Sequence, residues 1–370
     1  MNGPAMLEIE PRRIVAPPRN PYYIVAPHYI RTSAGIKAMH LLCHALNGMG
    51  QRAYMVIWPF IHYLSPTHPD LLTPLLTEDA INVDLQRGLT PITVYPETIA
   101  GNPLNAPFVV RYVMNFPGLL GGEKQFEPGE LCFGYSALLA EAVGAPENVL
   151  FIPASDPELF KPEPRAARRG TCFFAGKYKN FHGGELSRIT ADSMEITRDQ
   201  PDSQSPLEIA ELFRRSELFY CYENSALAIE ALLCECPVVF LPNPYLKEII
   251  ALKEFGLDGC AWGAEPREIE RAKATVAQGR MNYLRTFEEF WLQLEQFIDT
   301  TQAGARMIRY QRSLDTKRIN RSTRFDDLAR LSRAAVWVLR THGWKAFFRK
   351  SARKIGRVVT GTRESPQPRW

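Results

Sequence analysis

Two glutamates, Glu223 and Glu230, carry the clearest chemical potential in this sequence of 370 residues. Glu223 follows the apolar run 218–222, which predicts a buried strand, and Glu230 lies in the second turn of a helix predicted over 225–233. Ligands of open α/β sheets bind beyond the carboxyl ends of the strands, and the free N–H groups at a helix start favour a phosphate. A carboxylate in such a turn can accept both hydroxyls of a ribose. Two solvated surface acids would also explain this spacing.

The segment around these glutamates resembles the donor-site motif of GT-B glycosyltransferases, especially those of glycosyltransferase family 4. The usual motif is a glutamate, a short glycine-containing turn, a second glutamate, alanine, a small or apolar pair, glycine, a variable residue and Pro-Val-Val. The corresponding residues here are Glu223, Glu230, Ala231, Leu232, Leu233, Cys234, Glu235, Cys236, Pro237, Val238 and Val239. There are two departures: six residues separate the glutamates where the usual pattern has seven, and Glu235 replaces the usual glycine.

This resemblance implies a fold and a set of residue roles. The fold would be α/β with the GT-B architecture, in which two Rossmann-like α/β domains face a central cleft. Glu223 would be a catalytic residue facing the transferred sugar, and Glu230 would bind the nucleotide ribose. The residues that open the helix, where Asn224 or Ser225 is the predicted cap, would also bind the donor: Asn224, Ser225 and Ala226.

A basic stretch forms the second candidate site. The sequence Phe-Phe-Ala-Gly-Lys-Tyr-Lys ends a predicted strand at Gly176 and continues with Lys177 and Lys179. A leaving nucleoside diphosphate develops negative charge that a cation or a helix terminus must stabilise, and the resemblance places a basic residue near this point. We expect Gly176, Lys177 and Lys179 to bind the donor, although a solvated turn would have the same composition.

The first loop after a strand, residues 27–37, is the third candidate. His28 could be the general base of an inverting transfer, a polar residue that orients the substrate, or a structural, hydrogen-bonded histidine. In GT-B enzymes this loop carries a glycine that lets the backbone approach the donor phosphate, and Gly35 fits that role. Arg31 and Lys37 could bind phosphate on either substrate.

Other kinds of site are not supported by the sequence. It contains no G-x-x-x-x-G-K-[ST] and no G-x-S-x-G, so neither a P-loop nor a nucleophile elbow is expected. There is no CxxC or HExxH, and the seven histidines are scattered, so no protein-built metal site is expected. The resemblance also implies no bound metal, and we expect no cofactor apart from the nucleotide sugar as substrate.

The seven cysteines read as reduced, buried thiols of a reducing compartment.

The elements that must position these residues alternate between strands and helices, which predicts parallel sheets covered by helices. Predicted strands, besides the one already described, are 21–26, 53–57, 92–95, 108–113, 131–135, 149–152, 171–174, 194–197 and 238–241. Predicted helices are 33–47, 136–143, 182–190, 206–214, 225–233 and 245–254, and beyond Pro266 helices are expected to about 312 and over 325–357.

The length suggests two domains. We expect a flexible N-terminus (1–20), a Rossmann-like acceptor domain (21–160), a Rossmann-like donor domain (161–312) and a basic amphipathic helical tail (313–370), with the Pro- and Arg-containing stretch 156–170 as the linker. No apolar run is long enough to span a membrane.

The tail concentrates the positive charge of the chain. Residues 328–363 include ten Lys or Arg and no Asp or Glu, which is a charge of +10. Because the net charge of the whole chain is +4, the rest of the chain carries −6. Apolar residues recur near helical spacing between these cations, a pattern that suits the headgroup region of an anionic membrane. A helix packed on the body would have the same pattern, and nucleic acid is not an expected partner because no recognised module accompanies the charge. The predicted membrane-contacting residues are Arg340, Trp344, Lys345, Phe348, Arg349, Lys350 and Arg353.

Together these patterns predict a cytoplasmic glycosyltransferase, peripheral on the inner face of the cell membrane. It would move a sugar from a nucleotide-sugar donor to a lipid-linked or growing surface glycan, as in lipopolysaccharide, O-antigen or capsule biosynthesis. Resemblance to family 4 favours retention of the anomeric configuration, whereas His28 as base would mean inversion. Two alternatives stay open: a nucleotide-sugar epimerase of GT-B shape, and a non-catalytic membrane-associated scaffold of a polysaccharide assembly complex.

Overall fold

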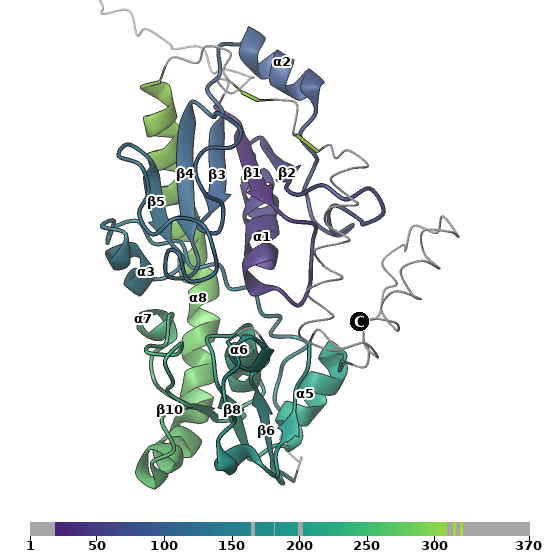
Figure 1. Cartoon of the computed structure of the whole chain (residues 1–370), viewed down its shortest axis with the longest axis vertical. Coiled ribbons are helices and arrows are strands. Elements are labelled where there is room, and N and C mark those ends of the chain that lie inside the picture. The colour runs from purple at the N-terminus through teal and green to yellow at the C-terminus, as the bar shows by residue number, and fades with distance from the viewer. Residues whose placement is uncertain are drawn as a thin grey trace, which may run out of the picture.

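Two parallel β-sheets form the framework of the protein, which confirms the predicted α/β architecture of two Rossmann-like domains (Figure 1). The computed structural model describes residues 19–163, 167–180, 182–198, 203–308, 314–315 and 319–320. Every pairing between the strands named below is parallel. Since parallel sheets are covered on both faces, their strands read as continuous apolar runs.

The first sheet has five strands in the order β2-β1-β3-β4-β5. Its β-branched and aromatic residues are almost all buried, as a sheet with helices on both faces requires. The strands are β1 (Tyr22–Ala26), β2 (Ala53–Ile57), β3 (Ile92–Pro96), β4 (Phe108–Val113) and β5 (Leu131–Gly134). The helices of this domain are α1 (Ala34–Gly48), α2 (Glu78–Gln86) and α3 (Ala137–Ala142).

The second sheet has the order β10-β9-β8-β6-β7. Numbered from its own first strand, it repeats the order 2-1-3-4-5 of the first sheet, so the two domains share one topology. The strands are β6 (Thr171–Phe174), β7 (Met194–Glu195), β8 (Leu218–Cys221), β9 (Val238–Phe240) and β10 (Cys260–Trp262). The helices are α4 (Gly176–Asn180), the 3-10 turn η1 (Arg188–Thr190), α5 (Pro206–Arg215), α6 (Ala226–Leu233), α7 (Leu252–Phe255) and α8 (Pro266–Arg306).

Several predicted elements differ from the structure, mainly where a short element is set by its tertiary contacts. Strand β10 and helix α2 were not predicted, and the helix expected over 182–190 is replaced by α4 and η1. The helix expected over 245–254 shortens to α7, and of the strand expected over 149–152 only one bridge, Gly134 with Val149, is formed. The helix expected over 325–357 lies outside the described residues.

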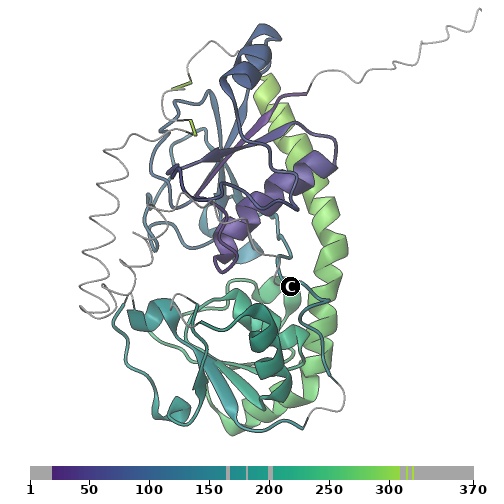
Figure 2. The same ribbon diagram turned by 90° about the vertical axis from the view of Figure 1, so that its right-hand side faces the viewer.

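Helix α8 connects the two domains along their whole length (Figure 2). In its N-terminal half, Tyr283 belongs to the core of the second domain. Further along, Phe290, Leu294 and Phe297 belong to the core of the first domain. The division at residue 161 assigned the entire helix to the donor domain, whereas its C-terminal half completes the other domain.

The end of α8 is fixed to the first strand of the protein. The hydroxyl groups of Tyr22 and Thr301 are 2.8 Å apart, and the backbone N–H of Asn20 donates to Gln302 Oε1 over 3.1 Å. The Tyr22 ring also stacks on Phe297, with 6.0 Å between the ring centroids. The first domain therefore depends on residues that follow the second domain in the sequence.

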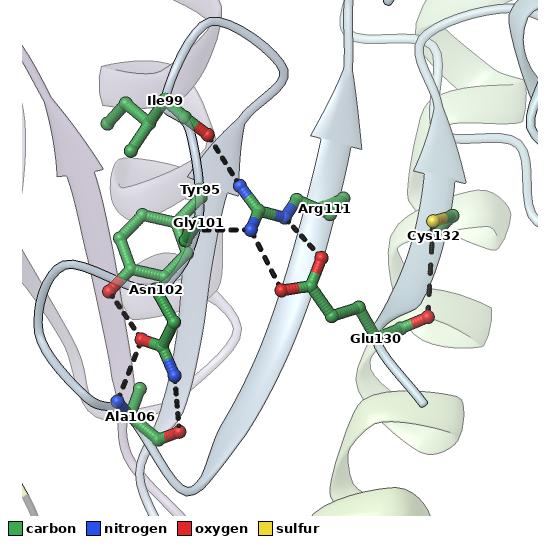
Figure 3. Close-up of polar contacts among 8 residues, drawn as sticks. All are labelled: Tyr95, Ile99, Gly101, Asn102, Ala106, Arg111, Glu130 and Cys132. Atoms are coloured by element: carbon green, nitrogen blue, oxygen red, sulfur yellow. Dashed lines mark hydrogen bonds and ion pairs between the residues drawn. The ribbon is translucent and has the colours of Figure 1, made fainter. Parts of the chain in front are cut away.

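A buried arginine, Arg111, fixes the loops at one edge of the first domain (Figure 3). Its guanidinium makes a two-pronged ion pair with Glu130 over 2.6 and 2.8 Å. It also donates to the carbonyl oxygens of Ile99 and Gly101 over 2.7 and 2.6 Å. Because a buried guanidinium needs a partner for each donor, these bonds hold the loop after β3 in one conformation.

The seven cysteines are free thiols, and six of them are buried. Burial raises the pKa of most of these thiols, that of Cys132 to about 11. Among the described helices, none combines the length and the apolar character needed to cross a membrane.

Candidate functional site

The shared strand order gives each sheet one switch point, where the first strand pairs with the second on one side and the third on the other. In the first sheet this point lies between β1 and β3, and in the second sheet between β6 and β8. Open α/β sheets bind ligands beyond the carboxyl ends of the strands at this point. We therefore expect a ligand site among the segments that follow these four strands.

A cavity of about 170 Å³ receives residues from all four segments. The first domain contributes Gly35 after β1 and Glu97 after β3. The second domain contributes Lys177 after β6 and Ser225 after β8. Among the remaining lining residues are Met114, Tyr135, Asn224, Ala226, Ile250 and Tyr283. Five predicted donor-site residues thus meet in one cavity between the domains: Gly35, Lys177, Asn224, Ser225 and Ala226.

Glu223 binds the start of the short helix α4, which carries Lys177. Its Oε2 accepts the backbone N–H groups of Lys177 and Tyr178 over 2.6 and 2.9 Å. Burial raises the pKa of Glu223, and the hydrogen bond from Tyr178 and the charge of Lys177 oppose that rise. Since the carboxylate is engaged by the backbone, its visible function is to position Lys177 at the cavity.

The start of helix α6 faces the same cavity. Ser225 is its cap, as predicted, and the Ser225 hydroxyl accepts the N–H of Leu227 over 3.3 Å. Asn224 does not cap the helix. Its side chain donates to Glu248 O over 2.9 Å and accepts from Ile250 N over 3.0 Å. Asn224 thereby fixes the 248–250 segment, part of which lines the cavity.

Glu230 is not among the residues that line the cavity, and it is paired with an arginine that the sequence did not single out. It is 6% exposed, and its Oε2 lies 3.1 Å from Arg198 Nη2. Arg198 Nη1 also donates to Thr32 O over 3.0 Å, which links the second domain to the loop after β1.

Glu97 is a cavity residue that the sequence reasoning missed. It is 3% exposed, and its Oε2 accepts the N–H of Met114 over 3.0 Å. Burial raises its pKa, an effect that the Met114 hydrogen bond and the charge of Lys177 oppose. The signal that could have found it is its place immediately after a buried strand, the same signal that drew attention to Glu223. The loop at Gly122 packs so closely that a Cβ there would lie 2.0 Å from Glu97 O.

His28 has a structural role in this fold. The ring nitrogen Nε2 accepts the N–H of Ile61 over 2.8 Å, and Nδ1 lies 3.1 Å from Ser65 O, to which it donates as the neutral tautomer. Because the basic lone pair is used by a backbone amide, the geometry disfavours His28 as the general base. Its bonds instead hold the loop that follows β2.

Two further predicted residues lie away from the cavity lining. Lys179 forms an ion pair with Glu195 of β7. Gly176 opens the five-residue helix α4, and a Cβ there would lie 2.6 Å from the Phe174 ring, so the glycine is needed for packing. Gly35 does line the cavity, in the first turn of α1, but a Cβ would make only ordinary contact with Met114 at 3.6 Å.

The position where Glu235 replaces the usual glycine keeps a glycine-like backbone. Its φ is +54°, in the left-handed region that favours glycine, between α6 and β9. The Glu235 N–H donates to Leu232 O over 2.9 Å, which closes the helix end. The departure from the motif is therefore one of residue type and not of backbone shape.

Solved structures with a similar arrangement of elements include three glycosyltransferases. The enzyme from Rickettsia africae is 9% identical, with a TM-score of 0.42 over 77% of this chain and 98% of that one. SnogD from Streptomyces nogalater is 13% identical, with a TM-score of 0.38 over 78% and 100%. WaaG, which is involved in lipopolysaccharide biosynthesis, is 10% identical, with a TM-score of 0.37 over 78% and 99%. No family model and no curated protein matches the sequence.

Within the part of the chain that the structure describes, no group of three or more His, Cys, Asp or Glu side chains could hold a metal ion. The predicted membrane residues lie outside the described residues: Arg340, Trp344, Lys345, Phe348, Arg349, Lys350 and Arg353.

Proposed function

We propose that the protein is a glycosyltransferase of GT-B type that moves a sugar from a nucleotide-sugar donor to a hydroxyl acceptor. The observation that carries this proposal is that both switch points open on one cavity. A transfer between two substrates needs each to be held by a separate scaffold with the reacting atoms in contact. Two identical sheet topologies facing each other supply that arrangement.

The second domain would hold the donor. The first turn of α6 and the Lys177 side chain line the cavity and favour the charge that develops on a leaving nucleoside diphosphate. Glu223 would act as a positioning residue by fixing the loop of Lys177. Glu230 would bind the ribose after exchanging Arg198 for the two sugar hydroxyls.

The first domain would hold the acceptor, with Glu97 as proton acceptor in place of His28. The acceptor oxygen attacks the anomeric carbon, the bond from that carbon to the diphosphate breaks, and its electron pair leaves with the nucleoside diphosphate. The acceptor proton passes to Glu97, whose buried carboxylate is suited to this task because its pKa is raised. This arrangement predicts inversion, in contrast to the retention that the motif favoured.

The cavity is small for a substrate site. Sites for small molecules usually measure roughly 300–1,000 Å³, whereas this cavity is about 170 Å³. The Arg198 contacts to Glu230 and to Thr32 bridge the domains next to it. We expect these contacts to open when a nucleotide sugar enters.

The acceptor would be a lipid-linked or growing surface glycan, with the enzyme peripheral on the cytoplasmic face of the membrane. The basic tail supports this choice, because each Lys or Arg near an anionic leaflet contributes on the order of 1 kcal/mol. Deleting residues 328–370 should lower binding to anionic vesicles and spare transfer to a soluble acceptor analogue. Unchanged vesicle binding would remove the anchor from the proposal.

The decisive experiment is calorimetric titration with UDP, GDP, dTDP and CMP sugars, followed by product analysis with acceptor present. Binding of one donor and transfer of its sugar would support the proposal. Release of an isomerised sugar nucleotide without transfer would favour the epimerase alternative. Absence of any binding would contradict the enzyme proposal and favour the scaffold alternative.

A further inference from the structure

Five of the seven histidines of the chain lie in or against one loop of the first domain, the segment 58–73 that follows β2, which we call the β2 loop. They are His28 in the segment after β1, His40 and His44 in α1, and His62 and His68 in the loop itself. The contacts of these side chains determine what a change in protonation does to the loop.

His28 holds the first half of the β2 loop. Its ring Nε2 accepts the N–H of Ile61 over 2.8 Å, and its Nδ1 lies 3.1 Å from Ser65 O. His28 is 4% exposed, and its ring packs against Phe60 with 5.5 Å between the ring centroids. Because Nε2 accepts a hydrogen bond, it carries no proton, so this contact needs the neutral imidazole.

His44 holds the other end of the loop in the same manner. Its Nδ1 accepts the N–H of Leu72 over 2.9 Å. Asn47, one turn further along α1, donates to the carbonyl oxygen of Leu72 over 2.9 Å. The thiol of Cys43 is a titratable neighbour of the same carbonyl, and burial raises the pKa of this thiol, so it keeps its proton. Leu72 is thus held at its N–H by a ring that can take up a proton and at its carbonyl by an amide that cannot.

His40 and His68 respond differently to a proton. His40 Nε2 lies 3.0 Å from Pro27 O, and its buried Nδ1 has no hydrogen-bond partner among the described residues. Burial lowers the pKa of His40, the hydrogen bond to Pro27 opposes this, and a charge on His28 lowers it further. His40 therefore stays neutral. His68 Nδ1 lies 3.3 Å from Asp70 N and 3.6 Å from Asp70 Oδ2, so a protonated His68 exchanges the amide for an ion pair.

The β2 loop supports the segment that leads to the cavity. The N–H of Tyr29 donates to Pro66 O over 3.1 Å. The Tyr29 ring packs against His40 and His68, with 5.4 and 5.0 Å between the ring centroids. Burial raises the pKa of Tyr29, although the charge of Arg31 opposes the rise, so the hydroxyl keeps its proton. This segment continues into the first turn of α1, which lines the cavity, so release of the loop would remove a support from the cavity wall.

We propose that His28 and His44 form a pH-sensitive clasp, which holds the β2 loop in place while both rings are neutral and releases it when they take up protons. A proton on His28 Nε2 turns an acceptor into a donor that faces the N–H of Ile61, and that bond is lost. A proton on His44 Nδ1 does the same to the bond with Leu72. Histidine in water takes up a proton at about pH 6.5, and the two bonds favour the neutral rings, so the loop should open below this value. The clasp lies within the first domain and does not depend on the proposed transfer reaction.

Hydrogen exchange of the full chain, measured by mass spectrometry, tests the clasp. Peptides that contain Ile61 or Leu72 should exchange about tenfold faster at about pH 5.5 than at about pH 7.5, after correction for the intrinsic rate, because each loses one hydrogen bond. Peptides from β8 and β9 in the second domain should keep their protection, which excludes global unfolding. Equal corrected exchange of the loop at both pH values would overturn the proposal.

Removal of the acceptors should reproduce the acidic state at neutral pH. His28→Ala and His44→Ala leave the N–H groups of Ile61 and Leu72 without these partners. The loop should then exchange about tenfold faster already at about pH 7.5, and acid should add little. Wild-type exchange in both alanine variants would show that the histidines do not hold the loop and would contradict the clasp.

Substitutions that keep the acceptor but cannot take up a proton separate the clasp from other effects of acid. His28→Gln places an amide oxygen where Nε2 lies, and His44→Asn places one where Nδ1 lies. The double variant should keep the β2 loop protected at both pH values. His182→Gln, in the second domain, is the matched control and should respond to acid as wild type does. A wild-type response in the double variant, or a response that disappears in His182→Gln, would rule out the two histidines as the pH-sensitive groups.

Discussion

Glu223 Oε2 accepts the backbone N–H of Lys177 over 2.6 Å, so the carboxylate after β8 holds the start of helix α4, which follows β6. The two strands are neighbours in the sheet, and their carboxyl ends lie at its switch point. Two segments that the sequence marked separately, Gly176–Lys179 and Glu223–Glu230, are thereby parts of one structural unit.

This bond predicts different outcomes for two substitutions at Glu223. Glu223→Gln keeps a carbonyl oxygen that can accept both N–H groups, so its KM for the donor should stay within about threefold of wild type. Glu223→Ala leaves both groups without an acceptor and should lower the free energy of unfolding by about 1–3 kcal/mol and raise the donor KM about tenfold. Steady-state kinetics and urea unfolding measure both. A hundredfold fall of kcat in Glu223→Gln with unchanged stability would instead show that the charge acts on the sugar.

The assignment of Glu97 as proton acceptor predicts a change in rate and not in donor binding. Glu97→Gln is nearly isosteric, and its kcat should fall by about 10²–10⁴-fold while donor affinity stays the same. The acidic limb of the pH dependence of kcat should disappear in this variant. Analysis of the product by NMR should find inversion at the anomeric carbon. A retained configuration, or a Glu97→Gln variant with wild-type kcat, would rule out this role.

The pKa of Glu97 also predicts a pH dependence of stability. Burial raises its pKa in the folded protein above the ordinary value of 4.5. The contribution of this carboxyl group to stability is therefore present below about pH 4.5 and is lost as the pH rises through the folded pKa. Relative to Glu97→Gln, which does not titrate, wild type should lose stability as the pH rises above 4.5. Urea unfolding at a series of pH values measures the difference, and a difference that is constant with pH would contradict it.

Glu230→Gln should change two affinities in opposite directions. Loss of the carboxylate removes an acceptor for the ribose, so a nucleoside diphosphate should bind about tenfold more weakly. The same loss removes the ion-pair partner of Arg198, which then carries an unpaired positive charge. Inorganic diphosphate, which has no ribose, should then bind more tightly. Titration of both ligands tests this, and parallel changes in the two affinities would mean that Glu230 does not contact the ribose.

The backbone at Glu235 predicts a stabilising substitution. A residue with a Cβ pays a steric cost of about 1 kcal/mol in the left-handed region, and glycine does not. Glu235→Gly should therefore raise the free energy of unfolding by about 0.5–1 kcal/mol, after its larger unfolded-state entropy is included. Glu235→Ala, which removes the carboxylate but keeps the Cβ, should give no such gain. Equal effects of the two variants would point to the charge of Glu235 and not to its backbone.

No single segment of the sequence determines the strand order of the two sheets. The alternation of strands and helices is nevertheless enough to predict two parallel α/β domains. A long apolar run such as Phe108–Val113 can be recognised as a strand, because a strand that is buried on both faces has no polar side. The three-residue strand β10 could not be found in this way. It forms because Cys260–Trp262 pairs with Val238–Phe240, a partner supplied by the tertiary fold.

In the candidate site, too, some features are set by neighbouring residues in the sequence and others by tertiary contacts. The sequence predicts a helix cap at Asn224 or Ser225, and the structure shows that Ser225 is the cap. The partner of Glu230 does not follow from the local sequence. Arg198 lies 32 residues away and approaches Glu230 only when β7 packs against β6. His28 was open to several roles, and only the positions of Ile61 N and Ser65 O decide among them.

Because α8 ends in the first domain, the order of synthesis and the order of folding cannot coincide. A ribosome makes β1 at the start and Thr301 and Gln302 nearly 280 residues later, yet Tyr22 and Asn20 bond directly to these two residues. Domains generally begin to fold as they emerge. Here the domain that emerges first has to wait, with part of its apolar interior uncovered, until the second has been made.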